Sequence, residues 1–214
     1  MVFILIGLFL WSLILSDSPM GGVPKAPHGM WTLTSHQLAL CLFQYANDNE
    51  GRYPRGKNSV EVCQKLIDGK YLSNPAIFYL PLKGKTKPLA GQPLKPENVC
   101  WDFTIRSDGS GLDASDPDSI PVVFLTGYKI NYVAGGTALP VLKPYPAFVY
   151  DDGSWSPWWR GHPDPSPGLA VAYKSNGAKF IFLDSKGIAP NVMPTDFAAN
   201  SNRYRQLTPN GPLP

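Results

Sequence analysis

The chain has 214 residues, which suits one domain of ordinary size with a small appendage. Charged residues make up 16% of it, below the roughly 25% of an average soluble domain. The net charge is only +3 and the chain has no basic stripe, so nucleic acid is excluded as an expected partner. The 23 prolines and 20 glycines predict a folded domain with many loops and extended connections.

The chain begins with an apolar segment, Val2–Leu15, that is interrupted only by Gly7 and Ser12. As a helix this segment would be about 21 Å long, shorter than the roughly 30 Å core of a bilayer. Its length is typical of the core of a signal peptide or of a short anchor. The alternative is a helix or strand buried in the domain itself. We expect export or membrane attachment through residues 2–15, and whether the segment is cleaved stays open.

Three regions are predicted from these patterns. Residues 1–18 form an apolar membrane anchor or signal segment, residues 19–33 a tether, and residues 34–214 a globular head. Prolines and glycines are frequent between residues 17 and 33, which predicts a flexible or extended tether. The expected location is the cell envelope, with the protein membrane-anchored or exported and its head outside the cytoplasm.

Two helices are predicted at the start of the head. The first begins at Thr34 or Ser35 and ends near Asp48, and its apolar residues recur at helical spacing. The second is capped by Asn58, with Glu61 three residues later as in a capping box, and ends near Asp68. The predicted buried residues are Leu38, Cys41, Leu42 and Tyr45 in the first helix, and Val60, Cys63, Leu66 and Ile67 in the second.

Strands and turns are predicted for the rest of the head. The clearest hairpin has Ser175-Asn176-Gly177 between two apolar runs, because Asn-Gly favours the turn that matches the twist of paired strands. Two further strands are expected around Thr126-Gly127, and the tail after Pro190 is expected to wrap the surface. Since helices precede strands without alternation, we predict an α+β fold with a small antiparallel sheet. The predicted strands are Val99–Ile105, Pro121–Leu125, Tyr128–Val133, Ala147–Tyr150, Leu169–Tyr173 and Lys179–Leu183, after a short apolar run at Ala76–Leu82.

The segment Gln37–Pro54, QLALCLFQYANDNEGRYP, resembles the place in pseudopilins and other prepilin-type proteins where the first helix enters the head. Looser similarity continues through Leu66–Leu72 and the later hairpin, Leu169–Phe182. The opening segment diverges from prepilins, because nothing basic precedes it and Val2–Leu15 contains no acidic residue. The resemblance implies a long N-terminal helix carrying a small antiparallel sheet, with no enzymatic activity. It also implies assembly with other pseudopilin-like subunits or envelope proteins in a type II secretion or pilus-like structure.

Metal and catalytic sites have little support in the sequence. The three cysteines, Cys41, Cys63 and Cys100, form no CxxC pattern, and a disulfide between the first two and simple burial are both open. The three histidines are too scattered to predict a metal cluster. Four carboxylates, Asp108, Asp113, Asp116 and Asp118, share one polar loop and are a candidate calcium site, which some pseudopilins have in a head loop. No other cofactor is expected.

A cluster of tryptophans, Trp155, Trp158 and Trp159, beside Arg160, is the most unusual local feature. Such residues either bury against the sheet or form a contact surface for protein or sugar. The sequence therefore predicts a non-catalytic assembly protein. The alternative is a surface binding module, with carbohydrate as one candidate ligand. A secreted hydrolase using His162 with Asp151, Asp152 or Asp164 is a third and weaker reading, because no nucleophile accompanies them.

Overall fold

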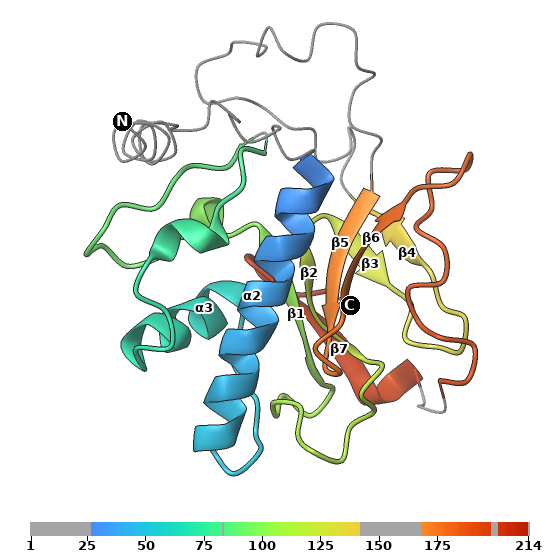
Figure 1. Cartoon of the computed structure of the whole chain (residues 1–214), viewed down its shortest axis with the longest axis horizontal. Coiled ribbons are helices and arrows are strands. Elements are labelled where there is room, and N and C mark those ends of the chain that lie inside the picture. Colours follow the sequence, from blue (N-terminus) through green and yellow to red (C-terminus); the bar gives the residue numbers. More distant parts are fainter. Residues whose placement is uncertain (1–26, 83, 142–167, 198–200, 214) are drawn as a thin grey trace, which may run out of the picture.

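The fold is described from a computed structural model for residues 27–82, 84–141, 168–197 and 201–213 (Figure 1). Within them, two α-helices pack with a six-stranded antiparallel sheet, and a separate two-stranded sheet lies behind it. This confirms the predicted α+β class with an antiparallel sheet. The apolar segment, residues 1–18, lies outside the described residues, as do the first residues of the predicted tether. No helix in the described ranges has the length and apolar character needed to cross a membrane.

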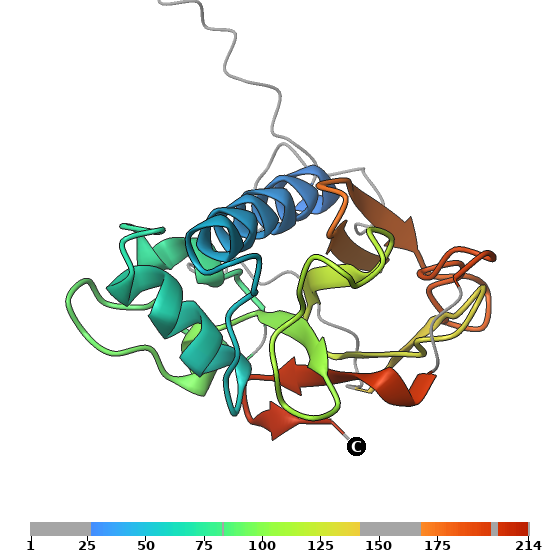
Figure 2. The same cartoon turned by 90° about the horizontal axis from the view of Figure 1, so that it is seen from below.

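The helix α2, Pro27–Asp48, begins seven residues earlier than predicted. Residues 27–33 are therefore helical, and the prediction of an extended tether is wrong for them. A proline suits the first position of a helix, and a Cβ on Gly29 would meet no atom within 4 Å. One stripe of α2 is buried and faces the sheet; it consists of Trp31, Ser35, Leu38, Ala39, Leu42 and Ala46. The helix packs mainly on β5 and β6 of the sheet, as Figure 2 shows.

The helix α3, Ser59–Asp68, begins and ends as the sequence predicts. The Asn58 side chain caps it by accepting a hydrogen bond from the Glu61 amide at 2.9 Å. Its buried residues are Ser59, Val62, Cys63 and Leu66, so the predicted stripe is wrong at two positions, since Val60 and Ile67 are only half-buried. Ser59 belongs to the buried face because its hydroxyl donates to the carbonyl of Leu207.

The six-stranded sheet has the order β6-β5-β2-β1-β7-β8. Its central strands β1 and β2 are buried on both faces, and Trp101 pairs with Leu125 across them. The turn between β5 and β6 confirms the predicted hairpin, with Asn176 at a φ of 65°. The strand bounds are β1 Trp101–Arg106, β2 Pro121–Leu125, β5 Gly168–Tyr173, β6 Ala178–Phe182, β7 Tyr204–Thr208 and β8 Gly211–Pro212.

The sheet differs from the sequence prediction in two places: one pairing was not predicted, and the placement of the tail is wrong. The strand β3, Tyr128–Ile130, pairs with β4, Ala138–Pro140, and not with β2. The tail does not merely wrap the surface, because it supplies β7 beside the central strand β1. A polar strand is stable there because the amide of Gln206 donates to Asp102 and to the carbonyl of Tyr128, which satisfies buried acceptors.

Short 3-10 helices occupy part of the connection between α3 and β1. They are η1, Pro75–Phe78, and η2, Pro96–Asn98, and a third, η4, Ser201–Arg203, precedes β7. The three cysteines are free, with Cys63 and Cys100 buried and Cys41 half-buried. All three cysteines are therefore free thiols, and the fold contains no disulfide between Cys41 and Cys63.

Candidate functional site

A polar cleft lies where α2 ends. Asn49, Glu50 and Gly51 stop the helix: Glu50 and Gly51 have φ angles of 56° and 77°, and the Gly51 amide donates to Ala46. The chain then turns back toward the loop after β1, where the Tyr53 amide donates to the Leu112 carbonyl at 2.8 Å. This approach requires glycine at position 111, since a Cβ there would lie 2.0 Å from the Tyr53 carbonyl oxygen.

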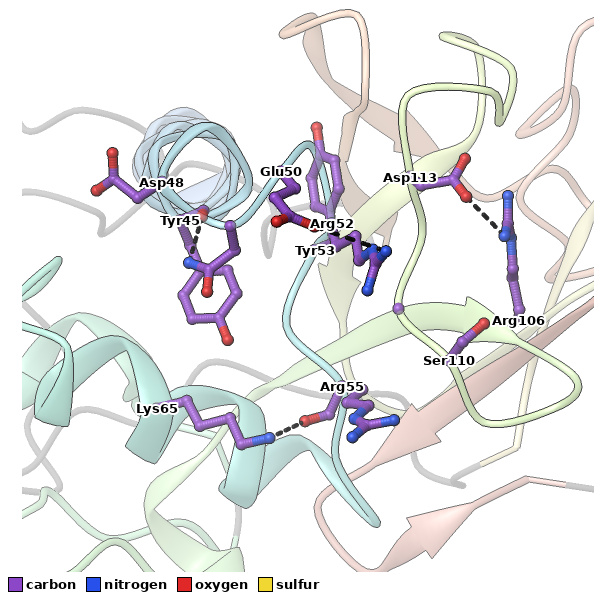
Figure 3. Close-up of a pocket in the computed structure, with 12 residues that line it drawn as sticks. Tyr45, Asp48, Glu50, Arg52, Tyr53, Arg55, Lys65, Arg106, Ser110 and Asp113 are labelled. Carbon is purple, nitrogen blue, oxygen red and sulfur yellow. Dashed lines mark hydrogen bonds and ion pairs between the residues drawn. The ribbon is translucent and has the colours of Figure 1, made fainter.

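The cleft has a volume of about 790 Å³ and mixes charges of both signs (Figure 3). Arg106 contacts Asp113 at 2.7 Å, and Arg52 contacts Glu50 at 3.6 Å in an exposed pair. The ammonium group of Lys65 donates to the carbonyl of Arg55. The lining residues are Tyr45, Asp48, Asn49, Glu50, Arg52, Tyr53, Arg55, Lys65, Arg106, Ser110, Gly111 and Asp113.

Two cations in this cleft, Arg55 and Lys65, form no ion pair among the described residues. Both side chains are exposed and available to an oxyanion or to hydroxyl groups. Burial raises the pKa of Tyr53 to about 12, with Asp118 adding to the effect, so its hydroxyl stays protonated and able to donate. The cleft thus offers hydrogen-bond donors for a polar ligand.

The four carboxylates of the predicted calcium loop all contact other side chains of the chain, and two of them share a partner. Asp116 is buried and accepts from Arg106, Arg203 and the Tyr204 hydroxyl. Asp113 also contacts Arg106, so these two carboxylates meet at one guanidinium. Asp118 pairs with Lys174 at 3.0 Å, and Asp108 accepts from Ser110 within its own turn.

Among the described residues, no three His, Cys, Asp or Glu side chains form a group that could hold a metal ion. The Ser110 hydrogen bonds lower the pKa of Asp108, and those of Ser115 lower that of Asp113. Both carboxylates are thus charged at neutral pH. The calcium site stays a prediction, and the two carboxylates that come together already share Arg106, with Arg203 as a second cation on Asp116.

The other residues singled out from the sequence are placed only in part. His28 lies on α2 with its ring 5.5 Å from that of Phe180, and His36 lies further along the same helix. The tryptophan cluster, Trp155, Trp158 and Trp159, lies outside the described residues, as do Arg160, His162, Asp151, Asp152 and Asp164.

The outer face of α2 is the second candidate surface. Four large apolar side chains on it, Met30, Leu33, Leu40 and Phe43, have between 41% and 50% of their surface exposed. The helix has no Lys, Arg, Asp or Glu between Pro27 and Asn47, so the polar positions of this face, such as Gln37 and Gln44, are uncharged. An exposed helix face without charge is unusual for a monomeric surface.

A buried carboxyl that the sequence did not predict lies on β1. The Nε2 atom of Gln206 donates to Oδ2 of Asp102 at 2.6 Å, whereas Oδ1 has no hydrogen-bond partner within the described chain. Burial raises the pKa of Asp102 to about 7, although Thr126, Gln206 and Lys85 act in the opposite direction. No local pattern marks this residue, because its partners come from distant strands.

In comparisons with known proteins, no protein-family model, no curated protein and no solved structure matches the chain.

The Asp116 contacts predict a specific cost for removing that carboxylate. Asp116→Ala removes the acceptor of Arg203 and of the Tyr204 hydroxyl, and it leaves Arg106 with Asp113 alone. We expect the free energy of unfolding to fall by about 3 kcal/mol. Asp118→Ala is the matched control in the same loop: its carboxylate is 77% exposed, and Lys174 keeps the carbonyls of Ala114 and Asp116 as acceptors, so we expect a loss of about 1 kcal/mol at most. Urea denaturation of the two variants measures both values, and equal losses would contradict a buried ionic anchor at Asp116.

The raised pKa of Asp102 predicts a pH dependence of stability. Between about pH 4 and pH 7 the unfolded chain ionises this carboxyl while the folded chain retains its proton, so stability falls as pH rises. Asp102→Asn removes this term, and we expect its stability relative to the native protein to increase by up to about 1.4 kcal/mol per pH unit in that window. Denaturation at pH 4, 5.5 and 8 measures the difference, and a pH-independent difference would contradict the assignment.

Proposed function

We propose that this protein is a non-catalytic, envelope-anchored protein resembling a pseudopilin, which assembles with further copies of its own chain through α2. The observation that carries the proposal is the outer face of α2, with Met30, Leu33, Leu40 and Phe43 exposed and no charged side chain before Asp48. The centres of protein interfaces are depleted in charged residues in the same way. The assembly is a secretion or pilus-like structure in this proposal.

A second copy is the occupant that fits this face best. Because the face is uncharged, two copies meet on it without like-charge repulsion and without leaving an ion unpaired. The apolar segment Val2–Leu15 precedes α2 in the chain by only about a dozen residues. In the proposal this segment holds every copy at the same membrane, which raises the local concentration of α2 helices at one height above it.

The α2 proposal predicts that a charge on the outer face weakens assembly. Leu40→Lys and Phe43→Lys place an ammonium group in the contact without touching the buried stripe of the helix. We expect each variant of the full chain, reconstituted in lipid vesicles, to give at least tenfold fewer chemically cross-linked oligomers than the native chain. Circular dichroism checks that each variant is folded.

Leu89→Lys is the matched control, since Leu89 is 64% exposed and lies away from α2. Its oligomer yield is expected to equal that of the native chain. A native chain that stays monomeric in vesicles, or α2 variants that assemble like the control, would contradict the proposal.

A surface binding module, with carbohydrate as the ligand class, is the second candidate function. The polar cleft favours it, because Arg55 and Lys65 present free donors beside tyrosines and carboxylates in a volume of about 790 Å³. Mixed polar groups of this kind orient hydroxyl-rich ligands.

Binding of a panel of neutral and uronic-acid oligosaccharides to the full chain tests this second function. We expect the Arg55→Ala/Lys65→Ala variant to lose at least tenfold in affinity, while Lys87→Ala, an exposed lysine outside the cleft, binds normally. Loss of binding only when Trp155, Trp158 and Trp159 are replaced by Ala would move the site away from the cleft, and no binding by the native chain would exclude this function.

A further inference from the structure

Within the residues that the structure describes, the strand β6, Ala178–Phe182, forms one edge of the six-stranded sheet and pairs only with β5. The Tyr173 amide donates to the Gly177 carbonyl at the hairpin. In an antiparallel pair every second residue bonds to the partner strand, so Lys179 and Ile181 are the residues of β6 whose backbone groups bond to β5. The N–H and C=O groups of Ala178, Phe180 and Phe182 therefore point away from the sheet. Within the described residues, no backbone or side-chain hydrogen bond satisfies them.

Among the described residues, this edge lacks the features that usually prevent an edge strand from pairing with another chain. Strand β6 contains no proline, and its five residues pair with β5 in unbroken register. Its one charged residue, Lys179, is turned back onto its own subunit: the ammonium group lies 5.1 Å from the Tyr173 ring centroid and donates to Asn191. The opposite edge is different, because β8 has only two residues and one is Pro212.

The side chains beside the free edge are aromatic. Phe182 is 51% exposed, and its ring centroid lies 5.0 Å from that of Phe180. His28 at the start of α2 contacts both rings. A regular, uncharged strand edge flanked by exposed aromatic rings is suited to pairing with another strand.

We propose that β6 pairs antiparallel with β6 of a second copy, across a two-fold axis at Phe180, and joins the two sheets into one. This interface is separate from the outer face of α2 and does not depend on the function proposed for that face. In an isologous interface each surface must complement itself, so the register of the pairing can be worked out from the sequence of β6.

The register centred on Phe180 is the one that pairs all five residues of β6. It places Phe182 opposite Ala178 of the second copy, so a large side chain meets a small one. It also places Lys179 opposite Ile181 of the second copy, whereas a shift that pairs Ala178 with Phe180 would set the two lysines directly opposite each other. Phe180 and its copy then exchange both backbone hydrogen bonds, because their N–H and C=O groups point outward.

The two α2 helices leave room for this pairing. Strands are spaced by about 4.8 Å, so β5 lies about 7 Å from the proposed axis. Helix α2 packs mainly over β5, and it also contacts β6 and β2, which lie on either side of β5. A helix centred over β5 would therefore lie on the order of 14 Å from its copy, which exceeds the roughly 8–10 Å separation of packed helices.

Disulfide trapping tests the register in the full chain, purified in detergent with Cys41→Ser removing the half-buried native thiol. Directly opposite, hydrogen-bonded residues have Cα atoms about 5.5 Å apart, which a disulfide spans. We expect Phe180→Cys to form a covalent dimer on mild oxidation. We expect Ala178→Cys and Phe182→Cys to do so only when the two variants are mixed, because each faces the other position across the axis. Leu89→Cys is the exposed control and stays monomeric.

The mixed pair keeps the test decisive if Phe180→Cys disturbs the packing on Trp31, whose ring centroid is 6.0 Å from that of Phe180. Failure of both Phe180→Cys and the mixed pair to cross-link would overturn the proposal, as would dimers from Ala178→Cys alone. An intramolecular disulfide between Phe182→Cys and a second cysteine introduced by Leu10→Cys would assign the edge to the apolar segment Val2–Leu15 of the same chain instead. The Leu40→Lys variant is expected to cross-link at β6 normally, which separates this interface from α2 assembly.

Discussion

The packing of α2 on the antiparallel sheet is the contact on which the rest of the structure depends. The buried stripe that includes Trp31, Leu38 and Leu42 covers β5 and its neighbours, and this fixes which side of the helix remains outside. With the apolar stripe satisfied inside the head, the exposed Leu40 and Phe43 are additional apolar surface that the fold itself does not use. The helix therefore has one face that builds the head and a second, exposed face on which the proposed assembly rests.

A second layer of constraint comes from the tail of the chain. Strand β7 lies beside β1, and its residues hold two buried acids by different means. Tyr204, with Arg203 just before it, binds the Asp116 carboxylate, which Arg106 also contacts. Gln206 can give Asp102 only one hydrogen bond, and that carboxyl keeps its proton up to about pH 7. Both contacts join residues far apart in sequence, so the sheet is complete only when the C-terminal segment has joined it.

The local elements could be predicted from the sequence where short-range physics decides them. The Asn58 cap with Glu61 marked the start of α3, and Asn176-Gly177 marked the β5–β6 hairpin. The start of α2 was missed because Pro27 and Gly29 read as helix breakers, although a proline is well tolerated in the first turn. Strand β7 was missed because its polar residues are satisfied only by distant partners. The polar cleft was missed for the same reason, since it depends on the close approach of Tyr53 to Gly111.

The environment of the outer face of α2 in the membrane-bound chain tests the central claim most directly. A nitroxide spin label at position 40 reports by electron paramagnetic resonance whether a water-soluble relaxation agent reaches it in full-chain vesicles. The account predicts an immobilised label shielded from the agent, while a label at position 89 in the same sample stays mobile and accessible. Equal mobility and equal accessibility at the two positions would contradict assembly through α2.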